Sequence, residues 1–69
     1  MKSLFDEKIK EFRDYKNLSQ GDLANIFNVT RQTVSAWENG IQETDFSTLI
    51  NLAKFFDVTV GQLLGVEEI

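Results

Sequence analysis

The chain has 69 residues and a formal net charge of -4, and it contains no cysteine, histidine or proline. A chain of this length builds one domain, here residues 1–69, and 42% hydrophobic with 26% charged residues is typical of a globular protein. Because Cys and His are missing, the sequence nearly excludes disulfides, zinc or copper sites and histidine base catalysis, so we expect no enzyme activity, metal or cofactor.

No apolar run reaches the length of a membrane span, and the opening residues MKSLFDEKIK are too charged for a signal peptide. We therefore expect a cytoplasmic protein without a membrane partner, and no small-molecule site is evident. The charge is uneven, because residues 41–69 hold five acidic side chains and one basic side chain. This acidity argues against non-specific attraction to nucleic acid.

Apolar residues recur at helical spacing in every segment, which predicts an all-α fold of five helices. We expect the helices near residues 3–16, 19–27, 30–39, 45–56 and 59–64. Phe5, Ile9 and Phe12 give the first helix one apolar stripe, and Ser3 is its expected N-cap. The fourth helix is expected to place one apolar face on the core, made of Phe46, Leu49, Leu52, Ala53 and Phe56.

One short pattern occurs three times between the expected helices: Asn or Asp, then a branched apolar residue, then Ser or Thr. Asn and Asp tolerate the left-handed conformation that ends many helices, and a Ser or Thr side-chain oxygen can cap the next helix. The pattern therefore predicts three tight corners, at Asn17–Leu18–Ser19, Asn28–Val29–Thr30 and Asp57–Val58–Thr59. Between the third and fourth helices, Gly40 and Asp45 are expected to bound the only sizeable loop.

The second and third expected helices are short and joined by a three-residue turn, which is the arrangement of a helix-turn-helix unit. Four apolar side chains fall where these helices would meet, and the small Ala24 allows a close approach. The four are Leu23, Phe27, Val34 and Trp37. At this spacing we expect Trp37 in the core and not at a binding surface.

The other side of the third helix is polar and almost uncharged. On a helical wheel its side chains fall within an arc of about 100°. Arg can bond guanine O6 and N7, and Gln can bond adenine N7 and N6, so this face suits the reading of base edges in a major groove. Its members are Arg31, Gln32, Ser35 and Asn39.

The stretch LSQGDLANIFNVTRQTVSAWENG resembles the Cro/CI-type helix-turn-helix family, also called the xenobiotic-response-element family, and the similarity covers about residues 8–65. The resemblance implies a compact five-helix, lambda-repressor-like DNA-binding domain. It also implies a bacterial or phage transcription regulator, specifically a repressor. Such a regulator binds double-stranded DNA as a homodimer on a palindromic operator, with the third helix in the major groove.

The resemblance assigns roles to particular positions. Base contacts are implied for Arg31, Gln32, Thr33, Ser35 and Ala36. Phosphate contacts are implied for Ser19, Gln20, Thr30 and Asn39. A structural ion pair between the first and third helices is implied for Arg13 and Glu38.

Two features leave alternatives open. The family often has Lys or Arg after ENG and a proline a few residues later, whereas this loop reads IQETD and adds Glu43. Together with the acidic balance, the loop favours a second hypothesis, a protein-interaction or antitoxin-like module on the same fold with weak or no DNA binding. The apolar C-terminal residues either close the core or form the seam of a homodimer, and they are Leu63, Leu64, Val66 and Ile69.

Overall fold

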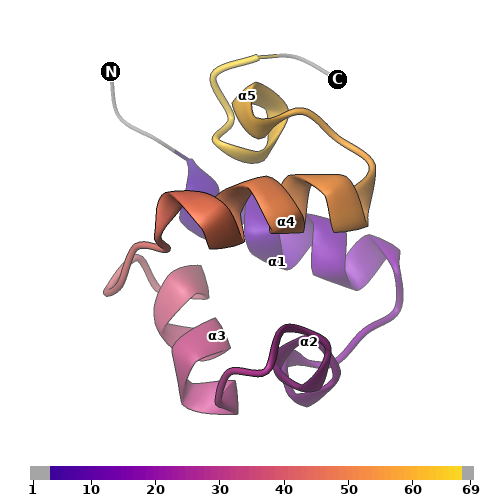
Figure 1. Cartoon of the computed structure of the whole chain (residues 1–69), viewed down its shortest axis with the longest axis vertical. Coiled ribbons are helices and arrows are strands. Elements are labelled where there is room, and N and C mark those ends of the chain that lie inside the picture. Colours follow the sequence, from indigo (N-terminus) through magenta and orange to yellow (C-terminus); the bar gives the residue numbers. More distant parts are fainter. Residues whose placement is uncertain (1–3, 68–69) are drawn as a thin grey trace.

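The computed structural model describes residues 4–67, which form five helices and no strand (Figure 1). The helices are α1 (Phe5–Tyr15), α2 (Gln20–Phe27), α3 (Arg31–Glu38), α4 (Phe46–Phe56) and α5 (Val60–Leu63). The all-α class is confirmed, and each helix begins and ends within two residues of its expected bounds. Ser3, the expected N-cap of α1, lies outside the described residues. None of these helices is long and apolar enough to span a bilayer.

The three repeated corners all close in the same way. Asn17, Asn28 and Asp57 have φ angles of 58°, 55° and 58°, which is the left-handed conformation expected for them. In each corner the N–H of the next residue donates to the carbonyl oxygen five positions back, at N···O distances of 2.9 to 3.2 Å. These bonds run from Leu18 to Arg13, from Val29 to Ala24 and from Val58 to Ala53. The predicted corners are confirmed, and they let successive helices fold back on one another.

Side-chain caps start the helices that follow these corners. At α2, Ser19 Oγ accepts the Asp22 N–H at 3.0 Å, and the Ser19 N–H donates to Asp22 Oδ2 at 2.9 Å, which completes a capping box. Thr59 and Gln62 form the same box at α5. Asp45 holds the N-cap position of α4 as expected, but its side chain makes no capping hydrogen bond. Hence α4 begins without the local stabilisation that α2 and α5 have.

The core lies where α1 passes behind α4, with α2 and α3 at one end of the molecule and α5 at the other (Figure 1). Each helix contributes one side chain with no exposed surface: Ile9, Leu23, Val34, Leu52 and Leu63. Burying an aliphatic side chain of this size contributes about 1.5–3 kcal/mol. Leu63 therefore closes the core, which decides between the two roles that the sequence left open for it.

Phe46 departs from expectation, because 79% of its surface is exposed. It is the first residue of α4, and Ile50, one turn later on the same side, is 40% exposed. This side of the first turn therefore faces solvent. The remaining expected residues of this face, Leu49, Leu52, Ala53 and Phe56, are buried. Periodicity places Phe46 near the stripe but does not tell where along α4 the core ends.

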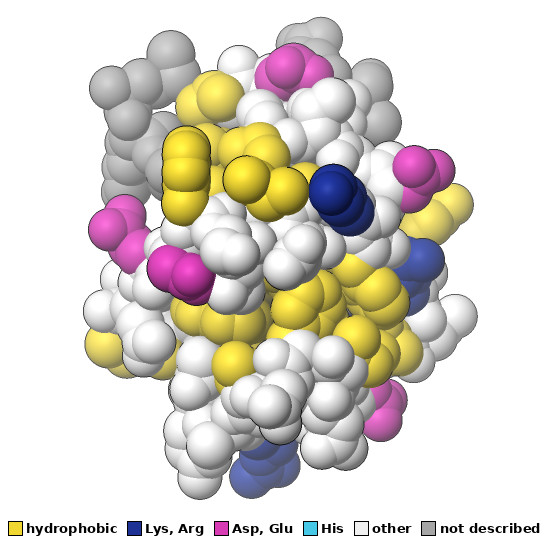
Figure 2. Space-filling model, in the orientation of Figure 1, with side chains coloured by type: hydrophobic (Ala, Val, Ile, Leu, Met, Phe, Trp, Pro, Cys, Tyr) yellow, Lys and Arg dark blue, Asp and Glu magenta, His cyan; other side chains and the backbone are white. Residues whose placement is uncertain are grey.

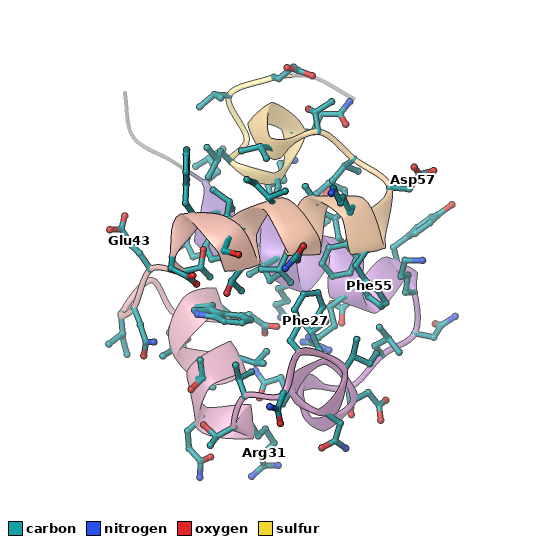
Figure 3. All side chains as sticks on the ribbon, in the orientation of Figure 1. Phe27, Arg31, Glu43, Phe55 and Asp57 are labelled. Atoms are coloured by element: carbon teal, nitrogen blue, oxygen red, sulfur yellow. The ribbon has the colours of Figure 1, made fainter. Side chains whose placement is uncertain are left out.

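Three aromatic rings join α2 to the end of α4. Phe55 is half-buried, and its ring meets Phe27 at 5.6 Å and Phe56 at 5.1 Å between centroids (Figure 3). Both contacts are edge-to-face, the geometry that aromatic pairs favour. Phe27 is therefore packed at the margin of the core, and it ties the helix-turn-helix unit to the rest of the molecule.

Candidate nucleic-acid interface

α2 and α3 pack against each other at the lower end of the molecule in Figure 1. Leu23 and Val34 are wholly buried, and Ala24 is 3% exposed. Trp37 is buried as well, and its ring meets Phe5 of α1 at 6.5 Å between centroids, so its expected core position is confirmed. This packing fixes α3 against α1 and leaves the opposite side of α3 open.

The first residues of α3 form the tip of the molecule. Arg31 and Gln32 are exposed, and Arg31 points away from the fold (Figure 3). Within residues 4–67 the Arg31 guanidinium has no hydrogen bond or ion pair to the protein. Figure 2 shows the same tip as uncharged polar surface around one basic side chain. The N–H donors of the Arg31 guanidinium are thus available to an acceptor outside the protein.

The two threonines at the start of α3 bond to each other. Thr30 Oγ1 accepts the Thr33 N–H at 3.1 Å, and the two hydroxyl oxygens lie 3.0 Å apart in a further hydrogen bond. Thr30 is therefore the N-cap that the corner pattern predicted. The Thr33 hydroxyl also takes part in this cap. The Thr33 side chain is therefore held more closely to the backbone than the side chains of Arg31 and Gln32.

A shallow groove of about 390 Å³ lies between the start of α2 and the outer face of α3. Its lining brings together six residues that the sequence singled out and one that it did not. They are Gln20, Arg31, Gln32, Ser35, Ala36, Asn39 and Ile41. Ser19, Thr30 and Thr33 do not line it. Ile41 is 80% exposed. Its position directly after Gly40, which has a left-handed conformation, is the one feature of the sequence that could have predicted Ile41 at this surface.

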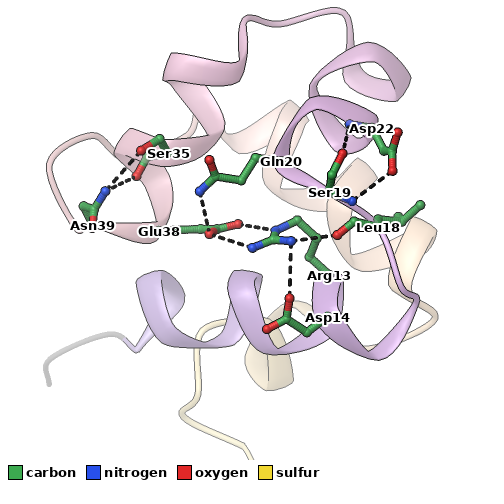
Figure 4. Close-up of polar contacts among 9 residues, drawn as sticks. All are labelled: Arg13, Asp14, Leu18, Ser19, Gln20, Asp22, Ser35, Glu38 and Asn39. Atoms are coloured by element: carbon green, nitrogen blue, oxygen red, sulfur yellow. Dashed lines mark hydrogen bonds and ion pairs between the residues drawn. The ribbon is translucent and has the colours of Figure 1, made fainter.

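Asn39 ends α3 and holds its side chain against the helix. Its Nδ2 donates to the Ser35 carbonyl oxygen at 2.9 Å and to Ser35 Oγ at 3.2 Å (Figure 4). The carboxamide oxygen of Asn39 has no partner among residues 4–67. These contacts fix the side chain at the rim of the groove.

Arg13 and Glu38 form an ion pair that joins α1 to the end of α3. Arg13 Nε lies 2.6 Å from Glu38 Oε2, and Arg13 Nη2 lies 3.1 Å from Glu38 Oε1. The side chains are 10% and 4% exposed, so solvent screens their attraction little. The hydrogen bond to Glu38 raises the pKa of Arg13, against the opposing effect of burial. α3 is thus held by an ionic contact as well as by Trp37.

The sequence did not predict that Gln20 would join this pair. Gln20 Nε2 donates to Glu38 Oε1 at 3.0 Å, so one carboxylate oxygen accepts from both α1 and α2 (Figure 4). The residues are eighteen positions apart in the chain. Local spacing carries no signal for such a contact, which depends on how α2 packs against α3.

Acidic groups flank the groove without lining it. Glu43 lies on the loop after α3, at the opposite end of that helix from Arg31 (Figure 3). Asp22 is exposed at the first turn of α2, and the backbone N–H of Ser19 lowers the pKa of its carboxyl group. Within residues 4–67 no three His, Cys, Asp or Glu side chains gather where they could hold a metal ion.

The helix-turn-helix family model matches residues 9–63, a span that contains both the packed helix pair and the groove. This chain belongs to the Cro/CI-type helix-turn-helix family. It is 40% identical over 65 residues to the HTH-type transcriptional activator BcrR of Enterococcus faecalis, a match that covers 94% of this chain and 32% of BcrR. It is 34% identical over 65 residues to the cryptic phage CTXphi transcriptional repressor RstR of Vibrio cholerae, covering 94% of this chain and 59% of RstR.

The helix-turn-helix fold is also similar to a solved structure. The crystal structure of a transcriptional regulator from Listeria innocua superposes with a TM-score of 0.90 at 27% identity, covering 100% of this chain and 65% of that one. The chain spans between about a third and three fifths of the length of the two curated relatives. What it shares with both of them is therefore the helix-turn-helix domain.

Proposed function

We propose that this protein is a transcription regulator that binds double-stranded DNA in a sequence-specific way, as a repressor, with α3 in the major groove. The observation that carries the proposal is the start of α3. Arg31 and Gln32 are exposed there, and the Arg31 guanidinium has no partner among residues 4–67. Side chains at the start of a recognition helix reach base edges, and Arg and Gln read guanine and adenine there.

Base contacts are assigned to Arg31, Gln32, Ser35 and Ala36, with Thr33 in a lesser role because its hydroxyl already bonds to Thr30. Phosphate contacts are assigned to the start of α2 and the ends of α3. These residues are Ser19, Gln20, Thr30 and Asn39. The N–H groups of Gln20 and Gly21 make no hydrogen bond within residues 4–67, and such donors at a helix start attract anions.

The working form is proposed to be a homodimer on a palindromic operator, joined through α4 and the C-terminal region. Apolar side chains gather over α4 (Figure 2), and Phe46, Ile50 and Val66 are 79%, 40% and 47% exposed. Patches of this kind suit a self-complementary contact. Ile69, which the sequence also offered for this seam, lies outside the described residues.

The relatives named above are transcription regulators, which supports a role without catalysis. We place such a regulator in the cytoplasm, where bacterial DNA lies. With few basic residues the protein makes few phosphate contacts. The logarithm of the binding constant should therefore fall with the logarithm of the salt concentration far less steeply than the slope of about -10 known for a protein with many such contacts.

Selection from random duplexes at low salt tests the proposal directly. Enriched sites should share a two-fold symmetric sequence with half-sites about one helical turn apart. Arg31→Ala should then weaken operator binding by about 1–3 kcal/mol and relax preference at one base pair. Lys54→Ala is the matched control, because it removes one exposed basic charge from α4 and should leave the ratio of specific to random binding unchanged. An unchanged ratio for Arg31→Ala would contradict the base-reading role.

The second candidate is a protein-interaction or antitoxin-like module on the same fold. The net charge of -4 and the loop with Glu43 and without Lys or Arg favour it. It predicts that no duplex is retained even at low salt, together with a protein partner of fixed stoichiometry. The same selection therefore separates the two candidates.

A further inference from the structure

A hydrogen-bond network links three helices at the start of α2, beside the groove (Figure 4). Glu38 Oε1 accepts from Gln20 Nε2 at 3.0 Å and from Arg13 Nη2 at 3.1 Å, while Glu38 Oε2 accepts from Arg13 Nε at 2.6 Å. Arg13 Nη1 is also engaged, at 2.6 Å from the Leu18 carbonyl oxygen and 3.3 Å from Asp14 Oδ1. Arg13 is thus committed to the protein and not to an external anion.

From this network we propose that Glu38 positions the Gln20 carboxamide to contact a DNA phosphate, and that Arg13 cancels the charge of Glu38 at that contact. The inference rests on the proposed function. Glu38 and Arg13 are positioning residues, because each acts through Gln20 and neither lines the groove.

The orientation of the carboxamide follows from the chemistry of its neighbour. An ionised carboxylate only accepts hydrogen bonds, so the amide nitrogen of Gln20 must face Glu38 and its oxygen must face away. One N–H of that nitrogen is used on Glu38, and the second remains for another acceptor. A phosphate oxygen is an acceptor of this kind. Because the side chain is held before DNA arrives, less conformational freedom is lost on binding.

The charge balance explains why Arg13 is required. An unpaired Glu38 carboxylate next to Gln20 would repel the phosphate that Gln20 is to bind. The contact with Arg13 is short and largely out of solvent, with the Glu38 side chain 4% exposed, so the pair presents little net charge to the groove. In a chain with a net charge of -4, this pairing offsets the carboxylate that directly contacts the Gln20 amide.

The test is a mutant cycle measured as affinity for the enriched duplex. Arg13→Met with Glu38→Leu replaces the ion pair by apolar side chains of similar volume, a change that folded proteins often accept. In the native background Gln20→Ala should weaken binding about tenfold, the scale of one hydrogen bond to a charged group. In the Arg13→Met/Glu38→Leu background the same substitution should weaken binding by no more than about threefold. Circular dichroism melts confirm that each protein is folded.

Asn39→Ala is the matched control, because Asn39 is a second proposed phosphate contact whose side chain is held by Ser35 and does not touch Glu38. Its cost should be the same in both backgrounds. Equal costs for Gln20→Ala in the two backgrounds would overturn the positioning role. If the ion pair only stabilised the fold, its replacement would lower the affinity for DNA but leave the effect of Gln20→Ala unchanged.

A measurement without DNA separates this inference from the proposed function. By NMR, the Gln20 side-chain amide protons should exchange more slowly than those of exposed Gln42, and the difference should disappear in the Arg13→Met/Glu38→Leu protein. Equal exchange rates for Gln20 and Gln42 in the native protein would overturn the tether itself. If no duplex is enriched at all, the proposed function fails and the positioning role fails with it.

Discussion

The two ends of the molecule differ in what they leave exposed. At the α2–α3 end Leu23, Val34 and Trp37 turn inward, although Ile26 and Ile41 are 51% and 80% exposed. The tip of this end is polar with one guanidinium (Figure 2). At the α4–α5 end Phe46 and Val66 remain exposed. Both ends are built with the same corner, through Asn28 at one and Asp57 at the other. The corner therefore determines how the helices turn, and the side chains beyond it determine which partner each end suits.

The two ends are also held together by different means. The α2–α3 end is fixed by a nearly buried ion pair, whereas the α4–α5 end depends on apolar packing and on a backbone bond from the Leu4 N–H to the Leu64 carbonyl oxygen at 2.7 Å. A change that removes one charged partner should therefore be far more harmful at the first end than the loss of an exposed side chain at the second.

The largest effect is expected for Glu38→Leu alone. It leaves Arg13 nearly buried with only the exposed Asp14 carboxylate, 3.3 Å away, as a counter-charge, and we expect the free energy of unfolding to fall by about 3 kcal/mol. Urea denaturation measures this loss. Adding Arg13→Met should restore most of it, and Glu43→Leu, in the exposed loop, should change stability by less than about 0.5 kcal/mol. A stable single variant would mean that the pair contributes little to holding α3.

Gly65→Ala tests the other end. Gly65 has a φ angle of 74°, and an added Cβ would lie 2.6 Å from the Leu4 Cβ. Strain and overpacking together should lower the free energy of unfolding by about 1–3 kcal/mol. Gly21→Ala is the control, since its Cβ would lie 3.7 Å from Ser19 Oγ, an ordinary contact, and the change should be neutral or slightly stabilising. Equal effects at the two glycines would contradict the close approach of Leu4.

The capping boxes of α2 and α5 should differ in how their contribution to stability depends on pH. Ser19→Ala and Thr59→Ala should each cost about 1 kcal/mol at pH 7. The Asp22 pKa is lowered from 3.8 by the Ser19 N–H, so the stability from this box is present above pH 3.8 and is lost as pH falls through the lower, folded-state value. The box at α5 uses Gln62, which does not titrate. Urea melts at pH 7 and pH 2 should therefore show the cost of Asp22→Ala shrinking at low pH, because the Asp22 carboxyl group is then protonated, and the cost of Gln62→Ala persisting.

The smallest effect on folding is expected for Phe46→Ser. With 79% of its surface exposed, Phe46 contributes little to the core, and unfolding should change by less than about 0.5 kcal/mol. Self-association should weaken if α4 forms the proposed dimer contact, which sedimentation equilibrium would measure. Tyr15→Ser, at a side chain 87% exposed on α1, is the matched control. Equal self-association of the native protein, Phe46→Ser and Tyr15→Ser would mean that the dimer contact does not include the start of α4.

Local chemistry allowed much of the fold to be predicted. The left-handed residues at 17, 28 and 57 and the caps at Ser19, Thr30 and Thr59 depend on neighbours within a few positions, so the chain alone determines them. The burial of Val34 and Trp37 on one side of α3, with Arg31 and Gln32 on the other, follows from helical periodicity. Whether these last two residues read bases stays a prediction.

Tertiary structure decided the rest, because it sets distances between segments that no local spacing records. The exposure of Phe46 depends on where α4 passes the edge of the core. The bond from Gln20 to Glu38 depends on the packing of α2 against α3, and it crosses eighteen positions of the chain. The sequence by itself therefore determined the helices, their corners and the polar face of α3. Only the packed fold decided which of those polar side chains are held in place and which apolar ones stay outside.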